Sequence, residues 1–350
     1  MVLSPPVRGE ILGVGVTHRL DLEGARSLVA RALAGAGADE LQAQATARAL
    51  IAAEADGQAG HGLSRTPSYA LQVRCGKVDG KARPELAKVA DAAVRIDGGR
   101  GFAYPALDLA IETLPGLTAK AGVACAAIHR SHHFGQAGAH AERLAERGLV
   151  ALVFGNSPKA MAFYGGKAPR LGTNPIAFAC PLPDGQPPLV IDLALSQAAR
   201  GKIVAAQQKG ETIPEGWAVD AGGQPTTDPT AALGGAMLAI GGAKGSALAL
   251  MVEILAAALC GASFGWEASS FFDDKGGPPD MGQILLALDP DALSGGRFLE
   301  RMGVLLGAMG EEPDVRLPGL KRLEARRRAA AEGLVVPPAL YDQIKALAEG

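Results

Sequence analysis

A histidine and an arginine lie four positions apart in the segment GHGLSR at residues 60–65. In a helical turn this spacing places His61 and Arg65 on one face. An arginine binds a carboxylate through two parallel hydrogen bonds, and an imidazole exchanges one proton near neutral pH. Together the two side chains could hold a 2-oxo acid and protonate its carbonyl. The alternative from spacing alone is a glycine-capped helix end with two exposed side chains.

Four of the six histidines fall within twelve residues: His129, His132, His133 and His140. The segment SHHFG at 131–135 follows an expected strand, and α/β folds bind ligands just beyond the carboxyl ends of strands. The turn GQAG at 135–138 then begins a helix whose free amides could meet an anion. The alternative is a set of hydrogen-bonded core histidines. A zinc site is disfavoured because no HExxH or HxH spacing occurs.

Two glycine-rich runs, at 98–101 and 241–246, resemble nucleotide loops only superficially. Neither is GxGxxG between a strand and a helix, and the second lacks the spacing of a P-loop, so no Rossmann fingerprint is present. The second run does place Lys244 at the start of an apolar helix, where free amides could help to bind an anion. Asp192 ends another expected strand. Its carboxylate could accept ribose hydroxyls, orient a histidine or cap the next helix.

Composition excludes several classes of protein. The 350 residues include 34 basic and 36 acidic side chains, so the net charge of −2 gives no electrostatic reason to expect nucleic acid or an anionic membrane as a partner. The 48% hydrophobic content excludes a disordered chain. The apolar stretch 11–16 is too short for a secretory signal. The longest apolar run, 247–262, is shorter than the ~20 residues of a membrane span and predicts a buried helix. A cytoplasmic protein is expected.

The elements that must position these residues are helical at both ends of the chain. Apolar spacing predicts helices at 20–35 and 39–55, with Asp39 as an N-cap. Between them and the C-terminal segment, strands are expected at 94–97, 123–128, 149–154, 176–180, 189–193 and 284–288. Further helices are expected at 105–121, 138–147 and 246–259, and after 337–338. The segment 207–233 reads as a long loop.

This order predicts an α+β fold with two domains. Residues 17–76, completed by 300–350, should form a discontinuous helical domain. Residues 77–299 should form a mixed-sheet domain without a Rossmann half, in which the candidate ligand-binding residues lie.

A set of short segments, taken jointly, resembles the type-2 malate/L-lactate dehydrogenase family. Its members include ureidoglycolate, sulfolactate and diketogulonate oxidoreductases and the piperideine/pyrroline-2-carboxylate reductases. The matching segments keep the family's order and spacing over about 20–345. They are GHGLSR at 60–65, SHHFG at 131–135, GG at 165–166, LGTNPIA at 171–177, VIDL at 190–193, ARGK at 199–202, IPEGWA at 213–218, PTTDP at 225–229, KG at 244–245 and LPG at 317–319.

The resemblance implies an oxidoreductase that binds NADH or NADPH on a non-Rossmann mixed-sheet domain and forms a homodimer with its active site near the subunit contact. His61 would be the proton donor and Arg65 the clamp on the substrate carboxylate. In the ureidoglycolate branch the residue matching His133 has the acid/base role. Ser157 and Thr173 would approach the substrate, and no metal is expected. The dinucleotide would lie against His133, Phe134, Gly135, Gln136, Ala137, Ile191, Asp192, Leu193, Lys244, Gly245, Pro318 and Gly319.

Two departures bear on the substrate. The cyclic-imine reductases place Ser before the catalytic histidine and Asp where Lys202 stands, whereas this sequence has Gly60 and Lys202. The segments 244–248 and 251–256 nevertheless look closer to the imine reductases. A 2-oxo/2-hydroxy acid pair (malate-, lactate- or sulfolactate-like) is therefore favoured, and an NADPH-dependent reductase of cyclic imino acids is the alternative. The third reading is a catalytically silent dinucleotide sensor or structural dimer. The presence of His61, Arg65, His133 and Asp192 argues against it.

Overall fold

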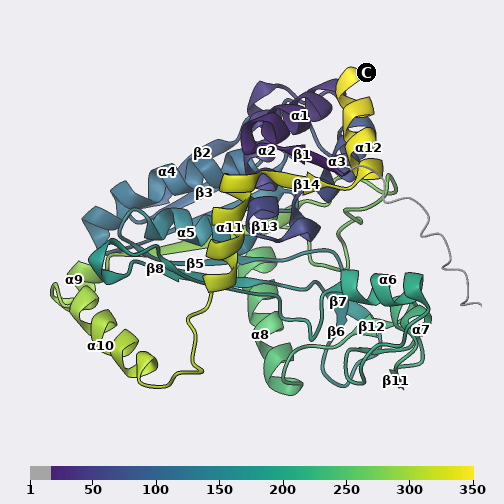
Figure 1. Ribbon diagram of the computed structural model, residues 1–350. Helices are drawn as coiled ribbons and strands as arrows, with labels where there is room; N and C mark the ends of the chain where they lie inside the picture. Colours follow the sequence, from purple (N-terminus) through teal and green to yellow (C-terminus); the bar gives the residue numbers. More distant parts are fainter. Residues whose placement is uncertain (1–16) are drawn as a thin grey trace, which may run out of the picture.

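The computed structural model describes residues 17–350, so the stretch 11–16 and the expectation placed on it lie outside the described residues. A seven-stranded mixed sheet forms its centre, in the order β2-β3-β4-β13-β5-β8-β9 (Figure 1). Only β3 and β4 run parallel, and the other neighbours are antiparallel. The predicted α+β class with a mixed sheet is confirmed. The strands are β2 (Glu85–Ala90), β3 (Ala93–Asp97), β4 (Val123–Ser131), β5 (Val150–Gly155), β8 (Ile176–Cys180), β9 (Leu189–Leu193) and β13 (Met281–Leu288).

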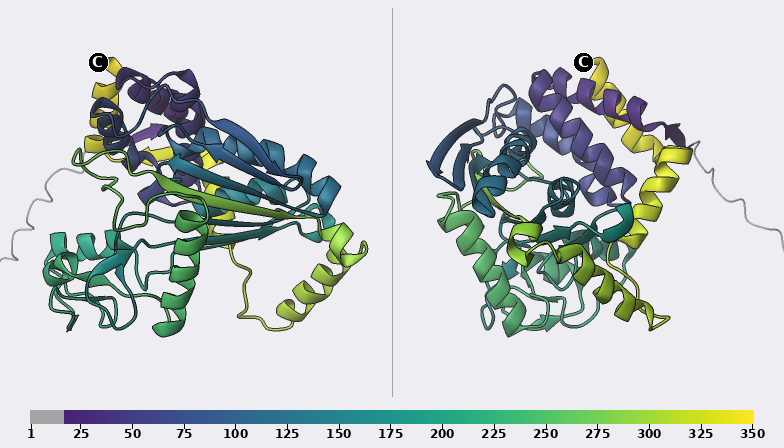
Figure 2. Two further views of the ribbon diagram at one scale, coloured as in Figure 1. Left: turned by 180° about the vertical axis from the view of Figure 1, so that it is seen from behind. Right: turned by 90° about the vertical axis from the view of Figure 1, so that its left-hand side faces the viewer.

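Helices cover both faces of this sheet. Helices α4 (Ala103–Ala121) and α5 (Ala137–Ala145) lie on one face, and α8 (Ala243–Glu253) with the π-helical turn η4 (Ile254–Ala258) lies on the other (Figure 2). Side chains alternate across a strand. Accordingly, Ala126 and Ile128 of β4 belong to the core under α4, whereas Ala127 packs on the core under α8.

The first and the last elements of the described chain lie side by side at one end of the sheet. Helices α1 (Leu22–Gly35), α2 (Glu40–Ala55) and α3 (Thr66–Arg74) pack with α12 (Pro338–Glu349), and β1 (His18–Leu20) pairs with β14 (Leu334–Val336) (Figures 1 and 2). Asp39 caps α2 by accepting a hydrogen bond from the amide of Gln42 at 3.1 Å, as predicted. The domain limits 17–76 with 300–350, and 77–299, remain predictions.

A buried ionic cluster ties α11 (Leu320–Glu332) to the core. Arg322 donates two hydrogen bonds to Glu142, at 2.6 and 2.9 Å, and Arg326 donates to Asp56 at 2.7 Å and to Glu142 at 2.8 Å. The Asp56 side chain has no exposed surface. The two arginines balance the two carboxylates, so the cluster is neutral only while all four members are present.

Arg322→Met should therefore lower the free energy of unfolding by about 3–5 kcal/mol, because it leaves a carboxylate buried without its partner. Arg328→Met, at an exposed position of the same helix, is the matched control and should change the unfolding free energy by less than about 0.5 kcal/mol. Urea titration of both variants measures the difference. Equal midpoints for the two variants would contradict this role of the cluster.

A second, five-stranded sheet lies beside the main one, in the order β11-β10-β12-β6-β7. The prediction of one long loop at 207–233 is wrong, because this segment contains β10, β11 and α7 and buries Ile213 and Ala218. Two-residue strands are too short to show an alternating pattern. The elements of this region are β6 (Met161–Ala162), β7 (Pro169–Leu171), α6 (Arg200–Lys209), β10 (Ala218–Val219), β11 (Pro225–Thr226), α7 (Pro229–Gly234) and β12 (Ala236–Met237).

Two helices leave apolar side chains uncovered. The prediction of a buried helix at 247–262 is wrong for one face: Val252 and Ala256 are buried, but Leu248, Met251 and Ile254 are exposed. Helix α9 (Pro290–Ser294) leads into α10 (Phe298–Gly310), which extends away from the sheet (Figure 1) and has no buried residue. Its exposed apolar side chains include Leu299, Val304 and Leu305.

Candidate active site

A double 3-10 turn between α2 and α3 carries the predicted histidine and arginine. It consists of η1 (Ala59–His61) and η2 (Leu63–Arg65). The carboxylate of Glu54 accepts a hydrogen bond from the amide of Leu63 at 2.8 Å. A Cβ atom at Gly62 would lie 2.1 Å from this carboxylate, so the close approach requires glycine. The turn therefore has a fixed geometry.

The Arg65 guanidinium has a fixed orientation, but not all of its nitrogens have a hydrogen-bond partner. Its Nε donates to the carbonyl of Gly60 at 2.6 Å, and its Cζ lies 4.7 Å from the centre of the Phe272 ring. Its Nη1 is buried and has no hydrogen-bond partner within residues 17–350. A buried guanidinium nitrogen without an acceptor marks a place for a ligand oxygen. Arg65 can thus bind a carboxylate.

His133 lies beside this turn, although 72 positions separate it from His61 in the sequence. The two imidazoles stack with their centres 5.3 Å apart. Nδ1 of His133 lies 2.5 Å from the hydroxyl of Tyr69, which in turn lies 3.1 Å from the hydroxyl of Tyr104. Nδ1 of His61 is buried without a partner in the described chain. The structure thus brings His61, Arg65 and His133 together.

Burial and the nearby positive charge keep both imidazoles neutral. Burial, and then the charge of Arg65, lower the pKa of His61 to about 4. Burial, followed by the charges of Arg65 and His61, lowers the pKa of His133 well below its ordinary value. Burial also raises the pKa of Tyr69 to about 12, so its hydroxyl stays protonated. A carboxylate bound to Arg65 would offset the arginine charge and raise the pKa of both histidines.

The lowered pKa of His61 predicts which direction of the reaction, reduction or oxidation, depends on pH. Reduction of a carbonyl consumes a proton, so the ratio of kcat/KM for reduction to kcat/KM for oxidation must change about tenfold per pH unit. If free His61 is neutral between pH 6 and 8, only a small fraction is protonated and can act as the acid in reduction. Nearly all of it is neutral and can act as the base in oxidation. We expect kcat/KM for reduction to rise about tenfold per unit as pH falls, while kcat/KM for oxidation stays constant. A constant reduction profile with a sloping oxidation profile would contradict this.

Several side chains around the histidines were missed from the sequence. Tyr69 lies four positions after Arg65, a spacing that could have revealed it. Gln72, Lys77 and Phe271 gave no signal, because their contacts join segments almost 200 residues apart.

The predicted dinucleotide residues near α5 gather at one end of β9. Asp192 accepts a hydrogen bond from the amide of Gly138 at 2.8 Å, so it caps α5, and burial raises its pKa. A Cβ atom at Gly319 would lie 3.3 Å from the carbonyl of Val190, which places the stretch 318–319 against β9, the strand that also carries Ile191 and Leu193. The turn 133–137, Asp192 and Gly319 thus occupy one region.

Two side chains of that turn face inward. Phe134 is buried, and a Cβ atom at Gly155 would lie 2.4 Å from its ring. Gln136 donates to Asp56 at 3.0 Å. Because these two side chains face inward, a ligand at this turn would contact the backbone of residues 134–137.

Ser157 and Thr173 form a separate pair. The amide of Thr173 donates to Ser157 Oγ at 3.1 Å, and the two hydroxyl oxygens lie 3.5 Å apart. Beside them, the buried carboxylate of Glu253 accepts hydrogen bonds from Asn174 at 2.7 Å and from the amide of Gly265 at 2.6 Å. Within the described chain no hydrogen bond joins the Ser157–Thr173 pair to His61 or Arg65.

Lys244 and Gly245 lie in the first turn of α8, next to a pocket of ≈ 620 Å³. Gly241 and Gly242, both with positive φ, line it together with the loop 163–166. A Cβ atom at Gly245 would lie 1.7 Å from the carbonyl of Ile240. Glycine is therefore required where the chain enters the helix, and the free amides there can meet an anion.

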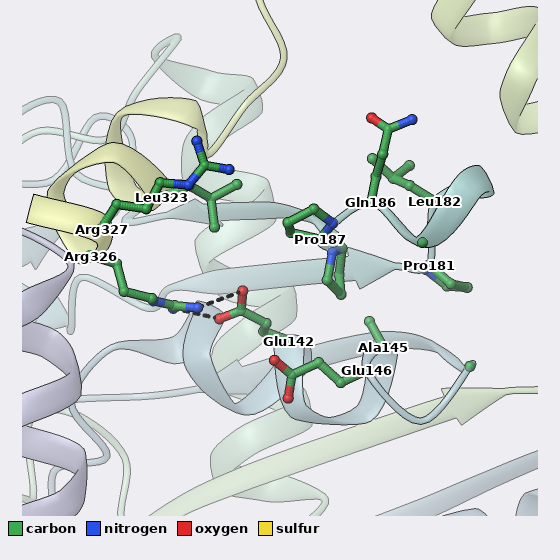
Figure 3. Close-up of a pocket in the computed structure, with 13 residues that line it drawn as sticks. Glu142, Ala145, Glu146, Pro181, Leu182, Gln186, Pro187, Leu323, Arg326 and Arg327 are labelled. Atoms are coloured by element: carbon green, nitrogen blue, oxygen red, sulfur yellow. Dashed lines mark hydrogen bonds and ion pairs between the residues drawn. The ribbon is translucent and has the colours of Figure 1, made fainter. Parts of the chain in front are cut away.

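A second pocket, of ≈ 580 Å³, lies between α5, α11 and the loop 181–188 (Figure 3). Figure 3 shows the ion pair between Arg326 and Glu142 on one side of this pocket. Gln186 and Pro187 lie on the other side. Because Arg326 is committed to these ion pairs, it is not free to bind an anion. His61, Arg65 and His133 line neither pocket.

Within the described residues no group of three His, Cys, Asp or Glu side chains could hold a metal ion. His132 bonds to Gln72, His133 to Tyr69 and His140 to the carbonyl of Phe134, so the three imidazoles do not converge. Of the helices in 17–350, none has the length and apolar content to cross a membrane.

Known proteins resemble this chain over nearly its whole length. The family described as malate/L-lactate dehydrogenase matches residues 20–345, and the chain belongs to this family. It is 50% identical to a (2R)-3-sulfolactate dehydrogenase (NADP(+)) of Chromohalobacter salexigens, over 95% of this chain and 99% of that protein. It is 41% identical to a Δ1-pyrroline-2-carboxylate reductase of Ancylobacter novellus, over 94% and 97%.

Solved structures agree. A Δ1-piperideine-2-carboxylate reductase from Pseudomonas syringae superposes with a TM-score of 0.89 at 39% identity, covering 95% of this chain and all (100%) of that one. A sulfolactate dehydrogenase from Methanocaldococcus jannaschii gives a TM-score of 0.87 at 31% identity, over 95% and 97%. The predicted family and the predicted class, an NAD(P)H-dependent dehydrogenase or reductase, are confirmed.

Proposed function

We propose that this enzyme interconverts a 2-oxo acid and the corresponding 2-hydroxy acid, with NADPH as the preferred cofactor. One observation supports this proposal above all: a single fixed turn carries both Arg65, whose buried Nη1 has no hydrogen-bond partner in the described chain, and His61, whose imidazole can exchange a proton. The NADP-dependent sulfolactate dehydrogenase that is 50% identical supports both the substrate class and the cofactor.

Residues of two regions fit a dinucleotide. The start of α8 offers Lys244 and the free amides behind two glycines of positive φ, next to a pocket of ≈ 620 Å³. The end of β9 offers Asp192 and the turn 133–137, where the amides of α5 begin. When bound, NADPH supplies the hydride that reduces C2 of the substrate.

The chain's own residues would then orient the substrate and move its proton. Arg65 binds the carboxylate and so fixes the position of C2 and its oxygen. His61 gives a proton to that oxygen as negative charge develops there, and in the reverse direction its neutral form accepts the hydroxyl proton. Tyr69 holds Nδ1 of His133, so the stacked His133 has a fixed orientation beside His61. Ser157 and Thr173 are also proposed to approach the substrate.

The alternative substrate is a cyclic imino acid. The reductase structure with a TM-score of 0.89 favours it. Against it, Gly60 and Lys202 stand where the resemblance implies a serine and an aspartate for those reductases.

NADPH oxidation with a panel of substrates separates these readings. The panel contains pyruvate, oxaloacetate, the 2-oxo acid of sulfolactate, and the two cyclic imines, Δ1-pyrroline- and Δ1-piperideine-2-carboxylate. We expect the highest kcat/KM for a 2-oxo acid. A higher kcat/KM for a cyclic imine would establish the alternative, and no turnover of any member would leave a dinucleotide sensor.

We also propose a homodimer. Leu248, Met251 and Ile254 on α8, and the apolar side chains of α10, are exposed in the single chain and would be covered by a second copy. Light scattering at micromolar concentration should give twice the chain mass of 35.6 kDa. A value near 35.6 kDa itself would refute the dimer.

The proposed location is the cytoplasm. All four cysteines, including the buried Cys180 and Cys260, are free thiols, which supports a reducing compartment.

A further inference from the structure

A buried lysine binds a segment that lies far from it in the sequence. The Lys77 side chain, 1% exposed, follows α3. Its ammonium donates to the carbonyl oxygens of Ser270 at 2.6 Å, Asp273 at 3.0 Å and Lys275 at 3.0 Å. An ammonium group has three N–H bonds, so all of them are spent on one segment.

A glutamine of α3 binds the same segment. Gln72 is fully buried, and its amide nitrogen donates to the carbonyl of Phe271. Its amide oxygen lies 2.5 Å from Nε2 of His132. Four carbonyls within residues 270–275 are therefore held from one side by Gln72 and Lys77.

The segment held in this way carries two aromatic rings that touch the candidate active site. The ring of Phe271 is buried, with its centre 5.0 Å from the imidazole centres of both His132 and His133. The ring of Phe272 lies under the guanidinium of Arg65, 4.7 Å from its Cζ, and is 61% exposed. Residues 271–272 thus contact the imidazoles of His132 and His133 and the guanidinium of Arg65.

Regular secondary structure does not hold this segment, since residues 263–280 contain no helix or strand. Burying an ammonium group is costly unless its hydrogen bonds are satisfied. At Lys77 they are satisfied by backbone oxygens, and the nearest carboxylate oxygen, on Asp273, lies 3.6 Å away. Lys77 and Gln72 therefore supply the side-chain hydrogen bonds that join residues 270–275 to α3 and the turn after it.

We propose that Lys77, together with Gln72, is a positioning residue for the reaction proposed above: it fixes residues 270–275 so that Phe272 orients the plane of Arg65 and Phe271 covers His133. This inference rests on the proposed function for its kinetic consequences. A planar guanidinium supported on one face by a ring presents its nitrogens in one plane, as bidentate binding of a carboxylate requires.

The test compares Lys77→Met, which keeps the length of the side chain and removes its donors, with Lys81→Met, an exposed lysine four positions later. In the full-length enzyme, Lys77→Met should raise KM for the 2-oxo acid about tenfold, because Arg65 loses its fixed orientation. The Kd for NADPH should stay within about twofold. Hydrogen exchange of the amides in 268–277 should become about tenfold faster or more, with exchange elsewhere unchanged. Lys81→Met should match the wild type in every measurement.

A second variant keeps the inference testable if Lys77→Met does not fold. Phe272→Leu changes an exposed side chain and removes only the ring under Arg65. It should also raise KM several-fold with an unchanged Kd for NADPH, and in the double variant KM should not exceed that of Lys77→Met alone. Wild-type KM in Phe272→Leu, or wild-type KM and exchange in Lys77→Met, would overturn the inference.

Failure of the proposed function has a different signature. If the wild-type enzyme reduces no 2-oxo acid and no cyclic imine, the proposed function fails, but the positioning role is still judged. Binding of oxamate, a non-reacting carboxylate of the same shape as a 2-oxo acid, then replaces KM as the readout, and hydrogen exchange in 268–277 is measured as before. Weaker oxamate binding in Lys77→Met together with faster local exchange supports the role, and unchanged values of both overturn it.

Discussion

Replacing His61 with alanine should lower kcat for reduction of the 2-oxo acid by about 10²–10⁴-fold, the usual contribution of general acid catalysis. Transfer of a hydride to C2 leaves negative charge on the oxygen, and the proton must arrive as this charge develops. His61 is placed for that role because its turn is fixed by Glu54 and the charge of Arg65, the residue proposed to hold the carboxylate, acts on its imidazole. The Kd for NADPH should change little, since His61 itself is not among the residues proposed for the dinucleotide, although it stacks on His133, which is.

The stacked His133 provides the competing assignment. If His61→Ala kept nearly wild-type turnover while His133→Ala abolished it, the acid would be His133, and the family assignment would survive. His18→Ala is a suitable control, because that imidazole stacks on Tyr341 at the opposite end of the chain. It should leave kcat and KM unchanged.

Changing Arg65 to lysine should mainly raise KM for the acid, by about 10–100-fold, with a smaller effect on kcat. Lysine keeps the positive charge but loses the hydrogen bond to Gly60, the flat surface on Phe272 and the proposed bidentate contact with the carboxylate. The interaction lost is present in both the ground state and the transition state, so it appears in KM. Arg74→Lys, exposed at the end of α3, is the matched control.

A third substitution at the same position separates charge from geometry. Because the charge of Arg65 contributes to lowering the pKa of His61, Arg65→Met should raise that pKa, whereas Arg65→Lys should leave it low. NMR titration of His61 measures the difference. An unchanged pKa in Arg65→Met would show that burial alone keeps His61 neutral.

Much of the main sheet could be predicted because its strands are short apolar runs between Gly or Pro residues. Strands β8 and β9 have the bounds expected from the sequence, 176–180 and 189–193. The small sheet could not be predicted, since four of its five strands, β6, β10, β11 and β12, are two residues long, and β6 pairs with β12 from a distant part of the chain. Helix α10 was missed because it has no buried face in the single chain.

The candidate site was predictable only in part, for a similar reason. Spacing brought His61 and Arg65 together, and the position of His133 after a strand marked it as a ligand-binding candidate. The bonds from Gln72 and Lys77 to 270–275 join segments separated by nearly 200 residues, and local pattern contains no information about such contacts. The same applies to Glu253, which lies in an apolar helix and accepts hydrogen bonds from Asn174 and from the amide of Gly265.

Transfer of the hydride from NADPH to C2 of the substrate can be followed with deuterium. NADPH carrying deuterium at C4, prepared in each of its two stereochemical forms, is oxidised by the enzyme with the best 2-oxo acid of the panel, and the product is examined by NMR. We expect a 2-hydroxy acid with deuterium on C2 from one of the two forms and no deuterium from the other. Oxidation of NADPH without deuterium at C2 of the product from either form would contradict it.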